Sequence, residues 1–194
     1  MSAQQILALL VSVSFAAGVN VYATVATLGL LARGGLVTLP GSLDPITSWW
    51  VIGISAVLFL LEFFADKIPY VDLIWNALQT FVRVPVGAVL AWAGTTGLGP
   101  EWQMAATVAG GALTFVAHGG KLAIRAAVTP SPEPVSNVVL STSEDAFTVL
   151  LVWFATRHPF LAAGVVLVLV VIALVLIRWV VRAIGAFFRE ARST

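Results

Sequence analysis

Long apolar runs separated by short polar breaks divide the chain into six segments. The clearest run, residues 160–177, contains no polar side chain. With its flanks, a run of this length spans the roughly 30 Å hydrocarbon core of a bilayer. The pattern predicts helices, in chain order, at residues 4–32, 49–66, 71–98, 101–127, 135–156 and 160–188.

Glycine, proline and serine mark the connections between these segments. Residues 34–48 have the composition of a loop, and residues 129–134 (TPSPEP) cannot form the interior of a helix. Within the third segment, Pro85 and Gly87 predict a break. The pattern leaves open whether segment 71–98 spans fully or is re-entrant.

The composition of the chain indicates its fold class. The chain is 60% hydrophobic and only 10% charged, whereas soluble domains carry about 25% charged residues. A buried helix of a soluble protein would explain one apolar run but not six. We therefore predict an all-α membrane protein of about six helices, with residues 1–194 forming a single polytopic domain.

The charged residues also indicate an orientation. If both termini are cytoplasmic, only Arg33 and Arg157 among the ten basic residues lie on the outer side, as the positive-inside rule requires. The basic C-terminal end, residues 178–194, then anchors the chain to lipid headgroups. The start, MSAQQ, lacks the positive region of a secretory signal, so the first helix is expected to be retained.

An offset of 61 residues suggests an internal repeat of two units, residues 49–98 and 101–157. The offset aligns Asn76 with Asn137 and Arg83 with Glu144, in addition to a proline and a tryptophan pair. Transporters often carry such repeats, with sites at the repeat interface. Chance alignment in a biased composition is the alternative.

Polar faces lie on the second and fourth predicted helices. Glu62 and Asp66 share one face of the second helix, and His118, Lys121 and Arg125 share one face of the fourth. Charges within spans usually face the bundle interior and have partners. We predict that the acidic face pairs with the basic one, with a purely structural or headgroup role as the alternative.

The third and fifth helices carry matching polar stripes. A buried Arg83 stays charged and needs an acidic neighbour, and Glu144 or Asp145 is the predicted partner. Two adjacent carboxylates without two cations or a metal imply that one holds a proton, which suits proton-coupled transport or cation binding. The alternative is a solvated first turn of the fifth helix.

These stripes and the amide of the first helix define the candidate site. The predicted substrate or ion pathway comprises Asn20, Glu62, Asp66, Lys67, Asp72, Asn76, Arg83, His118, Lys121, Arg125, Glu133, Asn137, Ser141, Glu144 and Asp145. No catalytic motif or cofactor fingerprint is present, and no cysteine is available as a nucleophile or metal ligand. A metal site from Glu62, Asp66, His118 and Glu144 is a weak alternative, since the spacing follows no ligand rule.

Several motifs resemble one family. They are Glu62-xxx-Asp66-Lys67-Ile68-Pro69-xx-Asp72-xxx-Asn76, Thr80-xx-Arg83-x-Pro85-x-Gly87-Ala88, His118-Gly119-x-Lys121-xxx-Arg125, Ser131-Pro132-Glu133-Pro134-x-Ser136-Asn137 and Glu144-Asp145. Over nearly the whole chain, the sequence resembles the prokaryotic membrane family known as domain of unknown function 4126. The resemblance implies a multi-pass protein of a bacterial or archaeal inner membrane and names no substrate.

Three functions fit these observations. The leading hypothesis is a small transporter or channel that moves an ion or small polar solute through a charged cavity between the repeat helices. The alternatives are a lipid-headgroup enzyme or binder at the cytoplasmic face, and a structural membrane subunit; an enzyme is not favoured. The expected partners are the lipid bilayer and a small solute, with a homo-oligomer left open. A net charge of +1 is too small to create a positive electrostatic field that would attract nucleic acid.

Overall fold

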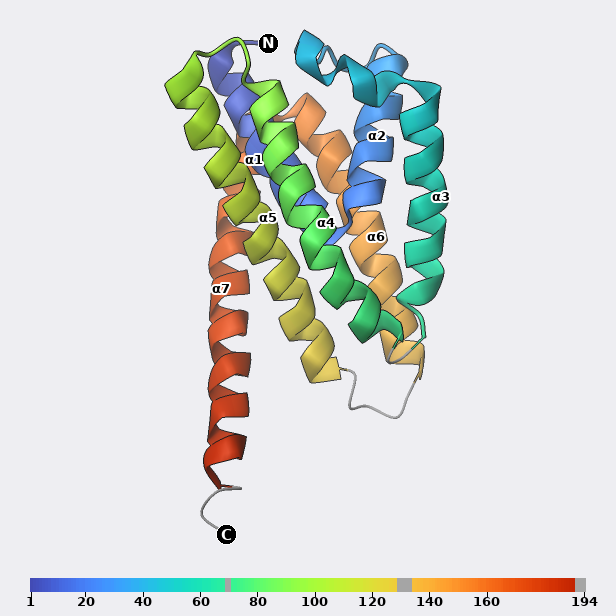
Figure 1. Ribbon diagram of the computed structural model, residues 1–194, viewed down its shortest axis with the longest axis vertical. Coiled ribbons are helices and arrows are strands. Elements are labelled where there is room, and N and C mark those ends of the chain that lie inside the picture. The colour runs from blue at the N-terminus through green and yellow to red at the C-terminus, as the bar shows by residue number, and fades with distance from the viewer. Residues whose placement is uncertain (69–70, 129–133, 191–194) are drawn as a thin grey trace.

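The computed structural model is a bundle of helices and describes residues 1–68, 71–128 and 134–190 (Figure 1). The helices are α1 (Ala3–Val19), α2 (Val21–Arg33), the 3₁₀ helix η1 (Gly41–Thr47), α3 (Trp49–Ala65), α4 (Val71–Gly94), α5 (Pro100–Val128), α6 (Pro134–Arg157) and α7 (Pro159–Glu190). No strand occurs in these three ranges. The bounds of α3 to α7 lie within a few residues of those predicted from the apolar runs.

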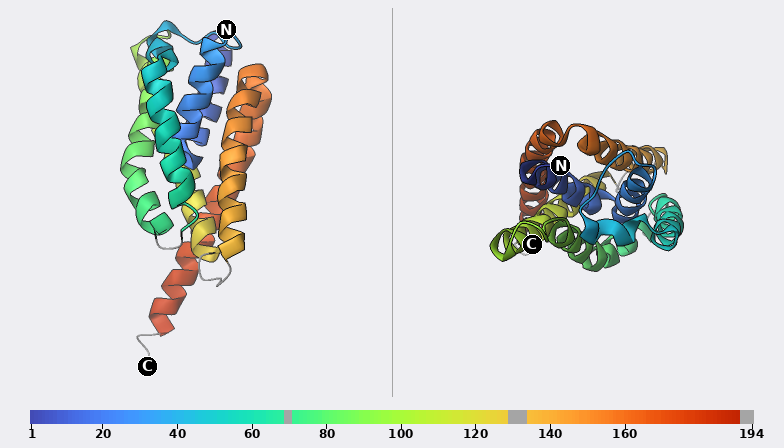
Figure 2. Two further views of the ribbon diagram at one scale, coloured as in Figure 1. Left: turned by 90° about the vertical axis from the view of Figure 1, so that its right-hand side faces the viewer. Right: turned by 90° about the horizontal axis from the view of Figure 1, so that it is seen from above.

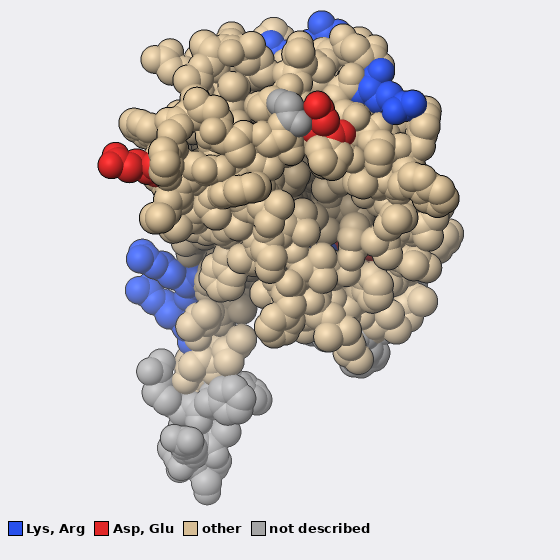
Figure 3. Space-filling view, turned by 45° about the horizontal axis from the view of Figure 1, so that its top comes forward, with Lys and Arg blue, Asp and Glu red and all other residues tan. Residues whose placement is uncertain are grey.

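Polarity in this bundle is inverted relative to a soluble protein. Large apolar side chains are exposed along every long helix, whereas carboxylates, guanidinium groups and amides are buried inside. On the face shown in Figure 3, tan side chains cover most of the bundle and only a few charged side chains are visible. Such an arrangement suits hydrocarbon outside and paired polar groups inside, as in helical membrane proteins.

Three helices are long and apolar enough to cross a membrane by themselves: Ile74–Gly94, Val135–Arg157 and Pro159–Ala186. The helices α1, α2 and α3 are apolar but shorter. The prediction of six spans is therefore not confirmed in the described part of the chain. Helix α5 runs the length of the bundle (Figure 1), but Lys121 and Arg125 make it less apolar.

The predicted first helix, residues 4–32, is wrong because the chain breaks at Asn20. This residue is extended (φ −149°, ψ 105°), and it ends α1 and begins α2. The chain reverses there, so that α1 descends to the middle of the bundle and α2 returns to the end where it started (Figures 1 and 2). At 1.5 Å per residue, the two half-helices are about 25 and 20 Å long, too short to cross about 30 Å of hydrocarbon.

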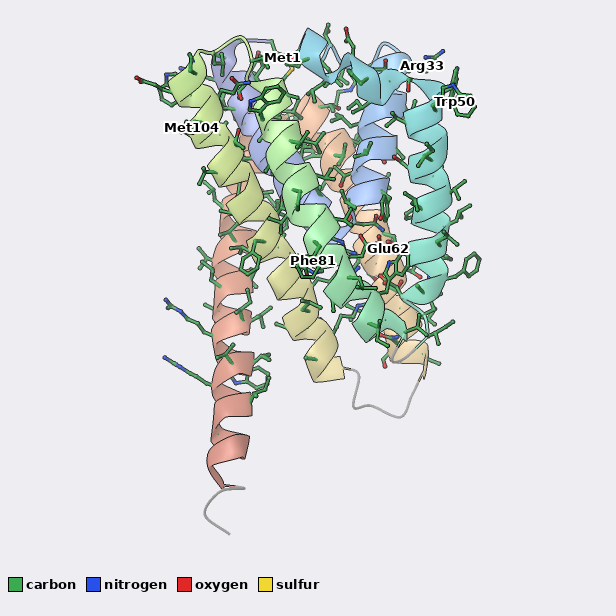
Figure 4. All side chains as sticks on the ribbon, viewed as in Figure 1. Met1, Arg33, Trp50, Glu62, Phe81 and Met104 are labelled. Carbon is green, nitrogen blue, oxygen red and sulfur yellow. The ribbon has the colours of Figure 1, made fainter. Side chains whose placement is uncertain are left out.

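This reversal determines at which end of the molecule Met1 lies. Met1 lies at the upper end of the bundle, whereas α7 descends past the lower end (Figures 1 and 4). Met1 and the lower end of α7 therefore lie at opposite ends of the molecule, whereas the side of the membrane on which each terminus lies stays a prediction. The physical reason is that the first apolar segment contributes a pair of half-helices instead of one crossing.

The predicted break in the third segment is also wrong. Residues Val71–Gly94 form one continuous helix with Pro85 inside it, and α4 rises along the full bundle (Figure 1). A proline removes one backbone hydrogen bond, which neighbouring helices compensate in membrane bundles. Gly87 serves close packing against α5, since a Cβ atom there would lie 1.9 Å from Thr114 Oγ1.

The half-helix α1 forms the centre of the bundle. It packs against α4, α5, α6 and α7, which enclose it in the view from above (Figure 2). Every residue from Ser12 to Val21 is buried. A helical segment that is buried on all sides is mostly apolar all round, so this part of α1 shows no amphipathic face in the sequence. The break at Asn20 consequently lies inside the protein.

The internal repeat stays a prediction. Helices α3 and α5 descend, while α4 and α6 rise (Figure 1), so the two proposed units run in the same directions. Equal direction is a requirement of such a repeat and not a test of it.

Candidate functional site

Charged side chains from four helices converge in the lower half of the bundle, where Glu62 is labelled in Figure 4. We call this group the charge cluster. It contains five carboxyl groups and three cations: Glu62 and Asp66 at the end of α3, Asp72 and Arg83 on α4, Lys121 and Arg125 on α5, and Glu144 and Asp145 on α6. All are buried except Glu144, whose side chain is 11% exposed.

The acidic end of α3 pairs with the basic face of α5, as predicted. Lys121 Nζ lies 2.8 Å from Asp66 Oδ2 and 3.5 Å from Glu62 Oε1. Arg125 Nη2 lies 3.2 Å from the same Asp66 oxygen, and Arg125 Nη1 lies 3.0 Å from Asp72 Oδ1. Two cations of α5 and three carboxylates from the end of α3 and from α4 thus neutralise one another in part.

The predicted partner of Arg83 is wrong. Its guanidinium Nη2 pairs with Glu62 Oε1, whereas Glu144 Oε2 lies 2.6 Å from Arg125 Nη2 and 3.4 Å from Lys121 Nζ. Helix packing explains the difference. Helix α4 packs against α1 and α5 and makes no close approach to α6 within the described residues.

Arg83 also fixes the proton on His118. Arg83 Nη1 lies 2.8 Å from His118 Nδ1, and an arginine can only donate. His118 Nδ1 is therefore an acceptor. The ring proton lies on Nε2, which is 3.1 Å from the Asn76 carbonyl oxygen and 2.8 Å from Thr80 Oγ1. His118 thus acts as a neutral link between α4 and α5.

Two cations of the charge cluster, Arg83 and Lys121, cap the end of α1 at which the helix breaks. Arg83 Nη1 donates to the Gly18 carbonyl at 3.2 Å, and Lys121 Nζ donates to the Val19 carbonyl at 3.3 Å. The last carbonyls of a helix have no partner within it and carry the negative end of its dipole. The charged donors from α4 and α5 supply hydrogen bonds to these carbonyls and positive charge near the negative end of the dipole. These contacts stabilise the break in its buried position.

Asn20 joins the broken helix to α6. Its Oδ1 accepts from the Ala23 N–H at 2.9 Å and caps α2, while its Nδ2 donates to Asp145 Oδ1 at 2.9 Å. Asparagine is among the best residues at the start of a helix. An asparagine inside an apolar run after Gly18 was therefore the sequence signal of the break, although the apolar pattern by itself predicted one continuous helix.

The remaining predicted residues surround the cluster. Asn76 Nδ2 donates to Asp72 Oδ1 at 2.6 Å, and Asn137 Nδ2 donates to the Asp66 carbonyl at 3.2 Å. Lys67 Nζ lies 3.5 Å from Ser141 Oγ. Glu133 lies outside the described residues. The structure thus brings together every predicted residue that it describes, although their functional role stays a prediction.

One contact near the cluster was missed from the sequence. Gln79 Nε2 donates to the Tyr22 hydroxyl at 3.1 Å, which joins α4 to α2 beside the break. Gln79 lies one turn before Arg83 on α4, so the polar stripe of that helix was the available signal.

Asp66 lies just past the end of α3 and has a shifted pKa. Burial raises the pKa of its carboxyl, but attraction to Lys121 and Arg125 and the hydrogen bond from Lys121 outweigh burial. The net result is a pKa below the ordinary value of 3.8. Asp66 is therefore a carboxylate at neutral pH and the anchor of the cluster's cations.

Carboxyl groups nevertheless outnumber cations in the cluster. Five of them face Arg83, Lys121 and Arg125, and the half-buried Lys67 adds only one more positive charge. Three carboxyl oxygens, Glu62 Oε2, Glu144 Oε1 and Asp145 Oδ2, are buried without a hydrogen-bond partner. Uncompensated buried charge is costly. At least one carboxyl group must therefore hold a proton or bind a cation.

A metal ion has no prepared site here. Within the described ranges, no three histidine, aspartate or glutamate side chains are placed to hold one. The alternative site of Glu62, Asp66, His118 and Glu144 does not form, since both ring nitrogens of His118 bond to protein groups.

A cavity of about 280 Å³ adjoins the cluster. It lies between α1, α5, α6 and α7, and its walls are mostly apolar. The lining residues are Phe15, Val19, Ala117, Gly120, Lys121, Ile124, Ser143, Glu144, Phe147, Leu169, Ile172, Ala173 and Leu176. Lys121 and Glu144 belong to both the cavity and the cluster, so the cavity gives the cluster an approach from the α7 side.

Comparison with known proteins gives a family and no relative of known activity. The model of the family described as Domain of unknown function (DUF4126) matches residues 7–179. No curated protein and no solved structure matches the chain.

Proposed function

Since the chain belongs to the DUF4126 family of domains of unknown function, for which no activity can be carried over, we propose a function from the charge cluster. The protein is a small membrane transporter that exchanges protons for an ion or small polar solute. The cluster is its binding and coupling site, in a bacterial or archaeal cytoplasmic membrane.

The observation that carries this proposal is the meeting of a broken helix with buried charge. The end of α1 and the start of α2 face the cluster through Gly18, Val19 and Asn20. Transporters bind substrates and coupling ions at such broken helices near the middle of the membrane, because the helix ends supply partial charges and free backbone groups. A purely structural subunit has no need of this costly arrangement.

The excess of carboxyl groups couples proton binding to substrate binding. Arg83 stays charged and holds Glu62, while Lys121 and Arg125 hold Asp66. Glu144 and Asp145 each keep one oxygen without a partner. A proton on one of these two groups restores the charge balance, and a cationic substrate restores it equally well. Binding of one therefore releases the other.

The proposed orientation follows from the basic residues. Lys67 follows the end of α3, and Arg178 and Arg182 belong to the C-terminal part of α7. Both segments lie toward the lower end of the bundle, whereas Arg33 is labelled at the upper end (Figures 1 and 4). The positive-inside rule then places the lower end in the cytoplasm. This keeps the predicted cytoplasmic side for α7 and moves the N-terminus to the opposite side.

A lipid-headgroup binder is the second candidate. It is favoured by the apolar walls of the cavity beside Lys121 and Glu144, which suit a lipid chain. It differs from transport in one measurable respect, since a binder moves no protons across the bilayer.

The experiment is a flux measurement with the purified protein in liposomes. A pH-sensitive dye inside the liposomes reports proton movement after addition of Na⁺, K⁺, NH₄⁺ or small organic ammonium ions outside. We expect cation-driven proton release with the native chain and at least a tenfold lower rate with Glu144→Gln or Asp145→Asn. Glu101→Gln is the matched control, because Glu101 is exposed in the first turn of α5, away from the cluster.

Two outcomes overturn the proposal. One is the absence of cation-driven flux with folded native protein for every cation tested. The other is equal flux for the native chain, Glu144→Gln and Asp145→Asn, with helicity unchanged by circular dichroism. The first outcome together with retained binding of lipid favours the second candidate.

A further inference from the structure

The cavity beside the charge cluster has the chemistry of a site for an amphiphilic ammonium ion. We propose that it binds an organic cation with an apolar body and one protonated amine, which approaches through the gap lined by α5, α6 and α7. This inference deepens the proposed function, on which it rests, by naming the substrate class.

The apolar walls select the body of the ligand. Phe15 from α1, Phe147 from α6, and Leu169 and Leu176 from α7 supply carbon surface around a volume of about 280 Å³, near the lower end of the size range of small-molecule pockets. A hydrated inorganic ion gains nothing from such walls, whereas apolar surface buried there is favourable by about 25 cal/mol per Å².

Glu144 selects the headgroup. One of its oxygens, Oε2, bonds to Arg125 and lies near Lys121. The other, Oε1, has no partner although it is buried. A ligand that donates a hydrogen bond to Oε1 satisfies this oxygen, and a charged donor does so about twice as strongly as a neutral one.

Lys121 disfavours the opposite headgroup charge. Its ammonium group is already engaged by Asp66, Glu144 and the Val19 carbonyl. An anionic headgroup would have to displace one of these partners, and it would add negative charge to a cluster in which carboxyl groups already exceed cations. An ammonium ion instead corrects that excess.

The exchange balances charge and protons. In the unliganded protein, the excess carboxyl group of the Glu144–Asp145 pair carries a proton. When R–NH₃⁺ binds, this proton leaves to solvent and the resulting carboxylate accepts a hydrogen bond from the ammonium group. No covalent bond to carbon changes, and one positive charge replaces another.

The test uses three probes with one apolar body: 4-phenylbutylamine, 4-phenylbutan-1-ol and 4-phenylbutyrate. Each is titrated by calorimetry into the full chain in lipid nanodiscs, with empty nanodiscs subtracted to remove partitioning into lipid. We expect the amine to bind roughly tenfold to a hundredfold more tightly than the alcohol, the range that a charge-assisted hydrogen bond provides. Repeating the titration in buffers of different ionisation enthalpy should show proton release with the amine alone.

Two variants separate the headgroup from the body. Glu144→Gln should remove the preference for the amine and leave binding of the alcohol within a few-fold. Leu176→Trp, which fills the apolar part of the cavity, should weaken amine and alcohol alike. Glu101→Gln should leave all three affinities unchanged.

Three results overturn the inference. Tightest binding of the carboxylate assigns the cavity to anionic headgroups, including those of lipids. Equal binding of all three probes shows an apolar pocket without headgroup selection. Unchanged amine preference in a folded Glu144→Gln variant removes the assigned contact. Because no gradient is applied, a failure here is distinct from a failure of proton flux, which tests transport alone.

Discussion

Asn20 and Asp145 are 125 positions apart in the sequence, and their side chains meet at 2.9 Å in the buried centre of the bundle. This hydrogen bond joins the start of α2 to the polar stripe of α6. Asn20 simultaneously caps α2. One amide thus decides where the first apolar segment turns back and which carboxyl group the turn faces.

Replacing Asn20 by alanine removes both contacts. We expect a loss of about 2–3 kcal/mol in the free energy of unfolding, about 1 for the helix cap and the remainder for the buried hydrogen bond. Ser48→Ala is the control, because Ser48 caps α3 by its side chain alone and should cost only about 1 kcal/mol. Equal losses for the two variants, measured by unfolding in mixed micelles, would show that the contact with Asp145 adds nothing.

The Glu62–Arg83 pair should be strongly coupled. Arg83→Met leaves Glu62 buried with Lys121 Nζ at 3.5 Å as its remaining cation, and we expect a loss of about 3–5 kcal/mol. The double variant Glu62→Leu/Arg83→Met removes the stranded charge and should be more stable than Arg83→Met alone. A double-mutant cycle measures this coupling, and additive losses would contradict it.

Asp66 should make the protein sensitive to acid. Because its folded pKa lies below its ordinary value of 3.8, its contribution to stability is complete above pH 3.8 and is lost as the pH falls through the folded pKa. The difference in unfolding temperature between the native chain and Asp66→Asn should therefore be constant from pH 7 to about pH 5 and shrink below about pH 4. A difference that grows on acidification would refute this assignment.

Adjacent glycines on α5 should respond in opposite ways to alanine. A Cβ atom on Gly110 would lie 2.5 Å from Ala91 Cβ, whereas one on Gly111 would lie 3.5 Å from Ala88 Cβ, an ordinary contact. Gly110→Ala should force α4 and α5 apart and destabilise the protein by about 1–3 kcal/mol. Gly111→Ala should be neutral or stabilising by up to about 1 kcal/mol, from helix propensity. Equal effects in thermal unfolding would show that α4 and α5 are not in this close contact.

The reversal at Asn20 leaves Met1 and the end of α7 at opposite ends of the molecule, and the proposed orientation in the membrane predicts that they lie on opposite sides of it. The chain has no cysteine, so single cysteines at the exposed positions Ser2 and Ala183 report each side separately. A membrane-impermeant maleimide added to intact cells should label Ser2→Cys and spare Ala183→Cys until the cells are opened. Labelling of both, or of neither, in intact cells would contradict the half-helix arrangement.

The sequence alone determined the helix bounds from Trp49 onward and the set of polar residues that meet inside. Both follow from local patterns, because hydropathy defines a span and helical periodicity defines a face. The pairing of Asp66 with Lys121 was also accessible, since an acidic and a basic face buried in one membrane must neutralise each other.

Only the tertiary structure decided the break at Asn20 and the partner of Arg83. An asparagine in an apolar run can continue a helix or cap a new one, and the choice depends on distant groups. Here Arg83 and Lys121 cap the carbonyls at the end of α1, and Asp145 holds the amide of Asn20. The physical reason is that buried backbone groups must find partners, and these partners come from helices whose packing no local pattern records.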